Sequence, residues 1–269
     1  MAVPHPSSTF RAVVTGASSG IGMELARVLA RRGHSVILVA RRGDVLEGLA
    51  DELRGDFSVE VEVRAMDLSD PSAVATLCDE LAEREISVLA NNAGVATFGP
   101  IAELDAAGER AQLRLNANAV HDLTLAVLPQ MVARGSGGIL MVGSAAGNMP
   151  IPNNATYAAS KAFVNTFSES LRGELKGTGV HVTLLAPGPV RTGVPSADDA
   201  STVDDLVPDF LWHDSSRVAE MSLDALARNK MRVVPGTLSK AMSVAGGYSP
   251  RAVVAPIVGR FYGKLGDGA

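Results

Sequence analysis

The chain has 269 residues, of which 46% are hydrophobic and 20% charged, and its formal net charge at pH 7 is −5. This composition excludes a mainly disordered chain, because enough apolar surface is available to offset the entropy lost on folding. The acidic total gives no sign of a nucleic-acid-binding surface. The single cysteine, Cys78, excludes an internal disulfide and a cysteine-based zinc site, and we expect no metal site. Residues 1–9 lack the features of a signal peptide, so we expect a loose leader and a cytoplasmic protein.

Short apolar runs alternate with longer amphipathic segments along the chain. The runs predict strands at residues 11–15, 35–40, 57–64, 86–90, 138–142, 180–185 and 232–234. The amphipathic segments predict helices at residues 20–32, 44–54, 70–84, 106–134, 157–176 and 217–228. The long helix at 106–134 contains Pro129, near which we expect it to bend or break.

Alternating strands and helices indicate repeated βαβ units and a parallel sheet. Right-handed crossovers then produce an α/β fold, a doubly wound parallel sheet of the Rossmann-like type. We expect a single domain over residues 10–235, followed by a C-terminal helical tail over 236–269. In such sheets the ligand lies beyond the carboxyl ends of the strands, so one site is expected from residues 16–22, 41–42, 67, 91–94, 144 and 187–192.

A glycine-rich turn joins the first strand to the first helix. Its pattern is G-x-x-x-G-x-G, formed by Gly16, Gly20 and Gly22. Glycines at these positions permit a tight turn and the close approach of a pyrophosphate to the free N–H groups of the helix. The expected cofactor contacts here are Gly16, Ser18, Ser19, Gly20 and Ile21.

The same residues allow a second interpretation. Gly16 to Gly20 also match G-x-S-x-G, the nucleophile turn of serine hydrolases, with Ser18 as nucleophile. His213, which follows Asp204, Asp205 and Asp209, supplies the required order of acid and base. The sequence has no oxyanion loop of the HGGG type, and this alternative is the less favoured one.

Two arginines follow the second strand and bear on the choice of cofactor. NAD sites place an acidic residue there, to bind the ribose 2′-hydroxyl. Here Val39 and Ala40 occupy that place, and Arg41 and Arg42 come next. Because guanidinium groups bind phosphate, we expect NADP(H) in preference to NAD(H).

Tyr157 and Lys161 are four residues apart at the start of a predicted helix, so they share one helix face. A free tyrosine has a pKa near ~10, and a neighbouring ammonium is expected to lower it toward neutrality. Ser144 ends a strand at the expected cleft, where its hydroxyl can hydrogen-bond a substrate oxygen.

Together these motifs resemble the short-chain dehydrogenase/reductase family over residues 10–192. The matching motifs are TGASSGIG at 15–22, Asp67-Leu68, Asn91-Asn92-Ala93-Gly94, Asn116, Gly143-Ser144, Tyr157 with Lys161, and Pro187-Gly188 running to Thr192.

The resemblance implies hydride transfer between NADP(H) and a carbonyl or alcohol substrate. It implies that Tyr157 is the acid/base and that Ser144 binds the substrate oxygen. Lys161 would then bind the nicotinamide ribose, and Asn116 would hold a water in a proton path. The further cofactor contacts that it implies are Asp67, Leu68, Asn91, Ala93, Gly94, Pro187, Gly188, Val190 and Thr192. A homodimer or homotetramer is also implied.

Residues beyond 192 are expected to determine the substrate. Residues 193–216 predict a lid. The helical tail is expected to pack on the domain or on a neighbouring subunit, and the alternative is a hydrophobic entrance for a long-chain or polycyclic substrate. The expected substrate is a hydrophobic ketone, steroid-like or 3-oxoacyl compound. Seven basic and no acidic residues lie between Ala225 and Gly266. This basic segment can contact an acyl carrier, a membrane surface or the acidic body of the protein, and the last is slightly favoured. A non-catalytic NADP(H)-binding sensor remains the alternative from another functional class.

Overall fold

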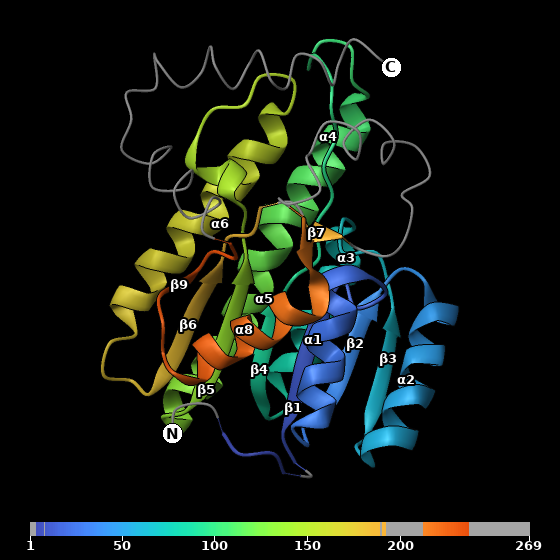
Figure 1. Ribbon diagram of the computed structural model, residues 1–269, viewed down its shortest axis with the longest axis vertical. Helices are drawn as coiled ribbons and strands as arrows, with labels where there is room; N and C mark the ends of the chain where they lie inside the picture. The colour runs from blue at the N-terminus through green and yellow to red at the C-terminus, as the bar shows by residue number, and fades with distance from the viewer. Residues whose placement is uncertain (1–3, 8, 189, 192–211, 237–269) are drawn as a thin grey trace.

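A computed structural model describes residues 4–7, 9–188, 190–191 and 212–236 (Figure 1). Most of the expected lid and all of the expected tail except Gly236 lie outside the described residues. The end of the expected lid is described: His213–Asp214 form strand β8, which pairs in parallel with β7 (Val190–Arg191), and α8 begins at Ser215.

Seven parallel strands form the central sheet, in the order β3-β2-β1-β4-β5-β6-β9. Their bounds are Arg11–Thr15 (β1), Ser35–Ala40 (β2), Val61–Ala65 (β3), Ile86–Asn91 (β4), Gly137–Val142 (β5), Val180–Leu185 (β6) and Arg232–Val233 (β9). The strand order reverses between β1 and β4, where a doubly wound sheet opens a crevice at the carboxyl ends of its strands. The predicted doubly wound α/β fold is confirmed.

Helices cover both faces of this sheet (Figure 1). The core between the sheet and one helical layer contains residues of α1 (Gly20–Arg31), α2 (Gly43–Phe57) and α8 (Ser215–Ala227). The core on the other face contains residues of α3 (Pro71–Ala82), α5 (Ala119–Arg134) and α6 (Ala155–Glu174). Neighbouring strand residues alternate between the two cores, because side chains along a strand point to opposite faces.

The second helix is longer than predicted. Residues 57–64 were expected to form a strand, but α2 continues to Phe57 and ends on Ser58, whose φ of 53° is left-handed. Leu46, Leu49 and Leu53 share the buried face of α2, and Phe57 packs against the same core. Contact with this core explains why the helical pattern prevails over the local alternation, and β3 begins only at Val61.

The long helical stretch after β4 is interrupted, but not at Pro129. It consists of α4 (Ala106–Leu113), a π-helical segment (Arg114–Asn118) and α5, which runs through Pro129 to Arg134. The expected break near Pro129 is therefore wrong as to its position, whereas a bend there remains a prediction. The π-helical segment carries Asn116 and Ala117 on its buried side. Such segments often accompany functional sites.

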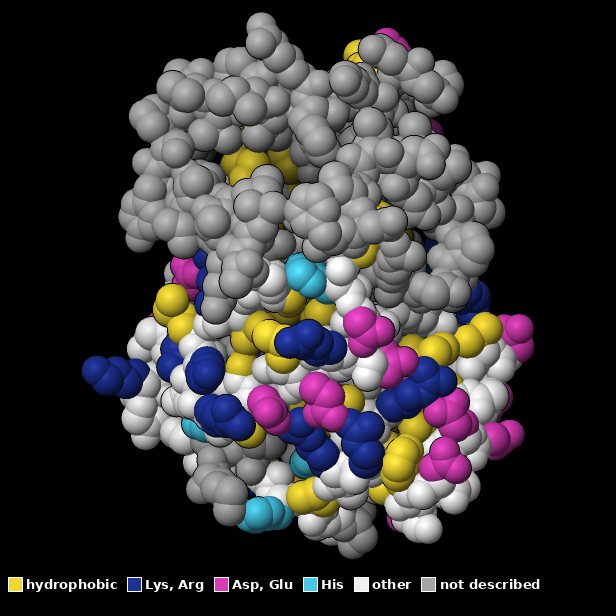
Figure 2. All heavy atoms as spheres, in the orientation of Figure 1, with side chains coloured by type: hydrophobic (Ala, Val, Ile, Leu, Met, Phe, Trp, Pro, Cys, Tyr) yellow, Lys and Arg dark blue, Asp and Glu magenta, His cyan; other side chains and the backbone are white. Residues whose placement is uncertain are grey.

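Ion pairs join elements that are distant in the sequence. Arg32, at the end of α1, contacts Glu220 at 2.7 Å and Asp224 at 2.8 Å, both on α8. Figure 2 shows basic and acidic side chains interspersed on the face of the molecule that includes α1 and α8. In the described part of the chain, no helix combines the length and apolarity needed to cross a lipid bilayer.

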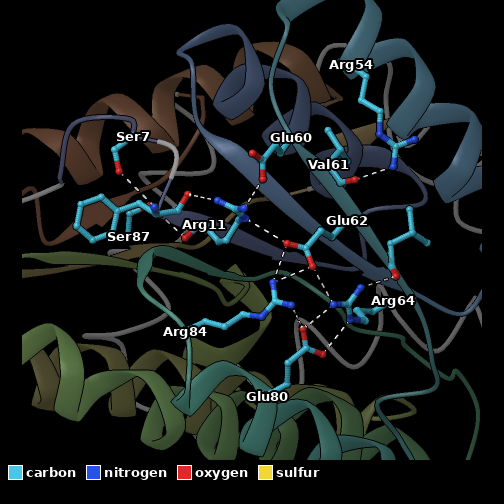
Figure 3. A network of polar contacts seen from close by, with 12 residues as sticks. Ser7, Arg11, Arg54, Glu60, Val61, Glu62, Arg64, Glu80, Arg84 and Ser87 are labelled. Carbon is cyan, nitrogen blue, oxygen red and sulfur yellow. Dashed lines mark hydrogen bonds and ion pairs between the residues drawn. The ribbon is translucent and has the colours of Figure 1, made fainter.

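A second network lies around Glu62 of β3 (Figure 3). The Glu62 carboxylate contacts Arg84 at 2.7 Å, Arg64 at 2.9 Å and Arg11 at 3.1 Å. Glu80 of α3 in turn pairs with Arg64 at 2.6 Å. Three chain segments, β1, β3 and the region of α3, are thereby linked through one carboxylate.

Candidate active site

A cavity of about 840 Å³ opens at the carboxyl ends of the strands. This volume lies within the ~300–1,000 Å³ of most small-molecule sites. The predicted residues that line it are Gly16, Ser18, Ser19, Gly20, Ile21, Arg41, Arg42, Asp67, Leu68, Ala93, Gly94, Tyr157, Lys161, Pro187, Gly188 and Val190. Residues from six separate segments thus meet at the position that the sheet topology requires.

The glycine turn forms one end of this cavity. Gly16 and Gly20 have φ angles of 67° and 55°, which side-chain-bearing residues rarely adopt. A Cβ added at Gly22 would lie 2.3 Å from the carbonyl oxygen of Gly16, so the helix could not approach the turn as closely. Ser19 is the N-cap of α1 and makes no side-chain capping bond, so the first N–H groups of the helix are available to an anionic ligand.

Ser18 is held by an arginine. The Arg42 guanidinium donates to the Ser18 hydroxyl at 3.0 Å and to the Ser18 carbonyl oxygen at 2.9 Å. A hydrolytic serine instead requires a histidine as its hydrogen-bonded base. Within the described residues no histidine makes that bond, so the geometry gives the serine hydrolase alternative no support.

Arg41 and Arg42 have different surroundings although they are neighbours. Both are exposed and both line the cavity. Arg42 is anchored to the turn through Ser18, whereas the described residues form no hydrogen bond or ion pair with the Arg41 guanidinium. Val39 and Ala40 lie beside them at the position where an acid would bind a 2′-hydroxyl. The Arg41 guanidinium is thus the cation available to a phosphate at this end.

Tyr157 and Ser144 lie together at the other end of the site. Tyr157 is in the first turn of α6, and Ser144 follows β5 as the N-cap of a short 3₁₀ helix (Ala145–Asn148). The Ser144 hydroxyl accepts a hydrogen bond from the Ala146 N–H at 3.1 Å, which leaves its own hydrogen free to be donated. Burial raises the pKa of Tyr157, and a hydrogen bond between its side chain and that of Ser144 opposes this rise.

Lys161 is buried one turn after Tyr157. Its ammonium donates to the carbonyl oxygen of Val142 at 2.9 Å and lies 5.8 Å from the centroid of the Tyr157 ring. Burial lowers the pKa of Lys161 to about 8. The expectation that this lysine lowers the pKa of Tyr157 is not met. Desolvation of the phenol dominates, and the opposing hydrogen bond comes from Ser144.

Asn116 makes contacts other than those implied by the resemblance. Its Oδ1 accepts from the Val95 N–H at 3.0 Å, and its Nδ2 donates to the Val95 carbonyl oxygen at 2.8 Å. A further bond at 3.1 Å joins Nδ2 to the Ser160 hydroxyl on α6. The side chain is fully buried and does not line the cavity. It therefore fastens the loop after β4 to α6, close to Tyr157.

Two further predicted contacts differ from expectation. Asn91 does not line the cavity, because its Nδ2 donates to the Thr124 hydroxyl at 3.0 Å in the core beside α5. Thr192 lies outside the described residues. Asn92, from the expected segment 91–94, also lines the cavity, and the lining residues that were missing from the expected set are Val39, Ala40, Met66, Val95, Ala96, Leu115, Val142 and Gly143. All except Leu115 lie within a few residues of a strand end, which is the signal that could have identified them.

These residues fit a dinucleotide. The glycine turn and Arg41 suit phosphate groups, while Gly94 leaves space beside Lys161 at the opposite end. A Cβ at Gly94 would lie 3.2 Å from Lys161 Nζ and 3.1 Å from Asn116 Oδ1. The cavity therefore provides anion contacts at one end and the Tyr157 phenol with the buried Lys161 ammonium at the other, where Ser144 directly follows the lining residue Gly143.

Comparisons with known proteins agree with this geometry. The family model described as short chain dehydrogenase matches residues 11–201. Sulfoacetaldehyde reductase 2 of Chromohalobacter salexigens is 39% identical over 216 residues, covering 78% of this chain and 85% of the relative. The bovine very-long-chain 3-oxoacyl-CoA reductase is 37% identical over 186 residues, which are 67% of this chain and 59% of the relative.

A solved structure provides the same result in three dimensions. The short-chain dehydrogenase from Sphingobium yanoikuyae in complex with NADPH has 32% sequence identity and a TM-score of 0.78, with 88% of this chain and 92% of that chain covered. The chain therefore belongs to the short-chain dehydrogenase/reductase family and is an oxidoreductase that uses a nicotinamide cofactor on carbonyl or alcohol groups.

Proposed function

We propose that this protein transfers hydride between NADP(H) and a hydrophobic ketone or secondary alcohol, with Tyr157 as the acid/base. The observation that carries the proposal is that Tyr157 and the buried ammonium of Lys161 line one cavity, with the Ser144 side chain close enough to Tyr157 to oppose the rise in its pKa. Tyr157 and Lys161 share this cavity with the phosphate-accepting glycine turn, and Ser144 directly follows the lining residue Gly143. The order of groups along the cavity matches the two ends of a dinucleotide.

The bound cofactor supplies or accepts the hydride at the nicotinamide, and the protein manages the proton and the orientation. Tyr157 delivers its phenolic proton to the substrate oxygen as negative charge develops on it during reduction. Ser144 donates to the same oxygen. Positioned donors of this kind contribute roughly 3–4 kcal/mol of transition-state stabilisation.

Lys161 suits the return of the proton and the binding of ribose hydroxyls. Its pKa of about 8 means that ammonium and amine forms are both accessible at near-neutral pH. Asn116 supports the site from the side, since it ties the loop at Val95 to Ser160. The expected water on Asn116 remains a prediction. Both Nδ2 hydrogens are engaged with protein groups and Oδ1 accepts one bond, so such a water would bind the second lone pair of Oδ1 or a backbone group.

The preference for NADP(H) rests on Arg41 and on the absence of an acid at Val39 and Ala40. Two relatives of known structure support it, each at 32% identity: the Sphingobium yanoikuyae enzyme with NADPH and a metagenomic short-chain oxidoreductase with NADP. A hydrophobic substrate is favoured by the apolar lining residues Val95, Ala96 and Leu115. The 3-oxoacyl class, named for the bovine relative, is one form of such a substrate.

The test is NADPH oxidation with a panel of ketones, steroids, quinones, aldehydes and 3-oxoacyl thioesters. We expect turnover on at least one hydrophobic ketone, and a loss of at least ~100-fold in kcat in Tyr157→Phe. The Kd for NADPH, measured by fluorescence, should stay within about twofold, and the exposed Thr166→Ala on the same helix serves as the matched control. Undiminished turnover by Tyr157→Phe would remove Tyr157 from the mechanism. NADPH binding without turnover on any carbonyl would favour a sensor.

The association of subunits and the role of the basic C-terminal segment remain predictions. A homodimer or homotetramer is expected, to be measured by light scattering. A contact between the tail and an acyl carrier or membrane would appear as salt-sensitive binding to acidic carrier protein or to anionic vesicles.

A further inference from the structure

A stripe of three polar residues, two of them buried and one partly exposed, runs along one side of α6. Tyr157, Lys161 and Asn165 follow one another at intervals of four residues, so they lie on the same helix face. The first two belong to the proposed machinery. Asn165 has only 5% of its surface exposed, although an amide costs free energy to bury unless it is hydrogen-bonded.

The Asn165 side chain binds both the N–H and the C=O of the Ser144 backbone. Its Nδ2 donates to the Ser144 carbonyl oxygen at 3.0 Å, and its Oδ1 accepts from the Ser144 N–H at 3.4 Å. Nδ2 also donates to Asn148 Oδ1 at 3.2 Å, at the far end of the 3₁₀ helix. One amide thus spans the short element that carries the Ser144 hydroxyl.

The sheet itself cannot supply these bonds. Gly143 and Ala145, on either side of Ser144, donate their N–H groups toward β6, to the carbonyl oxygens of Leu185 and Pro187. The N–H of Ser144 points the opposite way, as neighbouring groups along a strand do. On that side the pairing of β4 with β5 ends at Met141. Asn165 supplies the acceptor that a neighbouring strand no longer provides.

Two glycines make room for this amide. A Cβ at Gly143 would lie 2.1 Å from Asn165 Oδ1, and a Cβ at Gly147 would lie 2.6 Å from Asn165 Nδ2. Any side chain at either position would displace the amide from Ser144. The absence of side chains at Gly143 and Gly147 therefore lets the Asn165 amide reach the backbone of Ser144.

We propose that Asn165 is a positioning residue, which fixes the backbone of Ser144 so that the Ser144 hydroxyl is directed toward Tyr157 and the substrate oxygen. The inference rests on the proposed function of Ser144 and Tyr157. With the N–H and C=O of Ser144 held, its hydroxyl accepts from Ala146 and retains a single hydrogen for donation. Catalytic groups must be held within roughly 0.5 Å of the productive position, and a loosened turn loses that precision.

The experiment is a double-mutant cycle with Asn165→Leu and Ser144→Ala. Leucine has a similar size but no polar atoms, so the Ser144 N–H loses its partner and its carbonyl retains only the bond from Gly147. We expect Asn165→Leu alone to lower kcat by at least ~10-fold, with the Kd for NADPH within about twofold. In the Ser144→Ala background the same change should cost less than about twofold, because residues that act as one unit are not additive.

An equal fold-loss in both backgrounds, or no loss in either, would overturn the proposal. The matched control is Ser168→Ala, a buried residue of α6 whose hydroxyl donates to the Val164 carbonyl oxygen one turn earlier in the same helix. This control should leave kcat unchanged. If a substitution in α6 disturbs the helix generally, kcat will fall in this control as well. That result would contradict a specific role for Asn165.

A second variant covers the event that Asn165→Leu does not fold. Asn165→Asp keeps the acceptor for the Ser144 N–H but donates to its carbonyl oxygen only when protonated. The ratio of its kcat to that of the wild type should rise as the pH falls, and a ratio independent of pH would refute the assignment.

Hydrogen exchange separates this inference from the proposed function. The Ser144 amide should exchange faster in Asn165→Leu than in wild type, while the Gly143 amide, bonded to β6, should not change. This readout needs no substrate. Absence of turnover in the wild type would contradict the proposed function alone, whereas an unchanged Ser144 exchange rate would contradict the role of Asn165.

Discussion

Replacing Glu62 by glutamine should destabilise the protein without affecting the active site. Glu62 lies near the start of β3, where three arginines surround its carboxylate (Figure 3). Burial alone would raise the pKa of Glu62, but hydrogen bonds from Arg84 and Arg11, with those of Arg64, outweigh it and lower the pKa to about 2. In Glu62→Gln these arginines retain Glu60 and Glu80 but lose the carboxylate that they share.

The size of the effect follows from this pKa. A fall from 4.5 to about 2 corresponds to about 3.5 kcal/mol, at ~1.4 kcal/mol for each pKa unit. A quarter of the side chain is exposed to water, which screens the interaction, so we expect a loss of about 2 kcal/mol at pH 7. Because the pKa is depressed in the folded state, the stabilisation is complete above pH 4.5 and is lost as the pH falls toward 2.

The assay is urea denaturation of wild type and Glu62→Gln at pH 7 and pH 3. More than half of the deficit seen at pH 7 should disappear by pH 3. Glu60→Gln is the matched control, since among the described residues this exposed carboxylate pairs with Arg11 alone, and its cost should be below ~1 kcal/mol. The role assigned to the network would be refuted if the loss in free energy of unfolding were equal at both pH values. It would also be refuted by a loss at pH 7 below ~0.5 kcal/mol, which is typical of an exposed surface pair.

Three further changes test other parts of the structure. Arg41→Ala should raise the Kd for NADPH by roughly 10–100-fold, the equivalent of one charge-assisted hydrogen bond, and leave that for NADH unchanged, with Arg54→Ala as control. Gly22→Ala places a Cβ 2.3 Å from a backbone oxygen and should cost about 2 kcal/mol of stability, whereas Gly48→Ala in α2 meets no atom within 4 Å and should be neutral or stabilising. Burial, with nearby Arg32, lowers the pKa of His34 to about 4. Between pH 7 and pH 4.5 the free energy of unfolding, measured by urea denaturation, should therefore fall by about 2 kcal/mol more in the wild type than in His34→Leu. Equal losses in the two proteins would contradict this.

Much of the site was predictable because one topological rule converts sequence positions into spatial neighbours. Parallel strands end at the same edge of a sheet, so Gly16, Arg41, Asp67 and Gly94 could be placed together without any knowledge of contacts. The helix spacing of Tyr157 and Lys161 added the second half of the cavity. In each case the relevant signal is local in the sequence.

The remainder depends on registers between elements, which local patterns do not contain. Asn165 lies 21 residues after Ser144, and only the packing of α6 on β5 brings the two together. The orientation of Asn91 toward Thr124 likewise depends on how α5 sits against β4. The strand assigned from residue 57 failed for a related reason, since the helical face of α2 finds its core partners only in the folded protein.

The π-helical segment at Arg114–Asn118 has a consequence for the tolerance of this region to insertions and deletions. A π-helical turn accommodates one residue more than an α-helical turn, so the faces of α4 and α5 are out of phase with each other. Removing a single residue there would restore a regular helix and rotate one side of it by roughly 100°. Asn116 would then leave Val95 and Ser160, although no residue of the cavity wall had been substituted. In this stretch of the chain the number of residues matters as much as their identity.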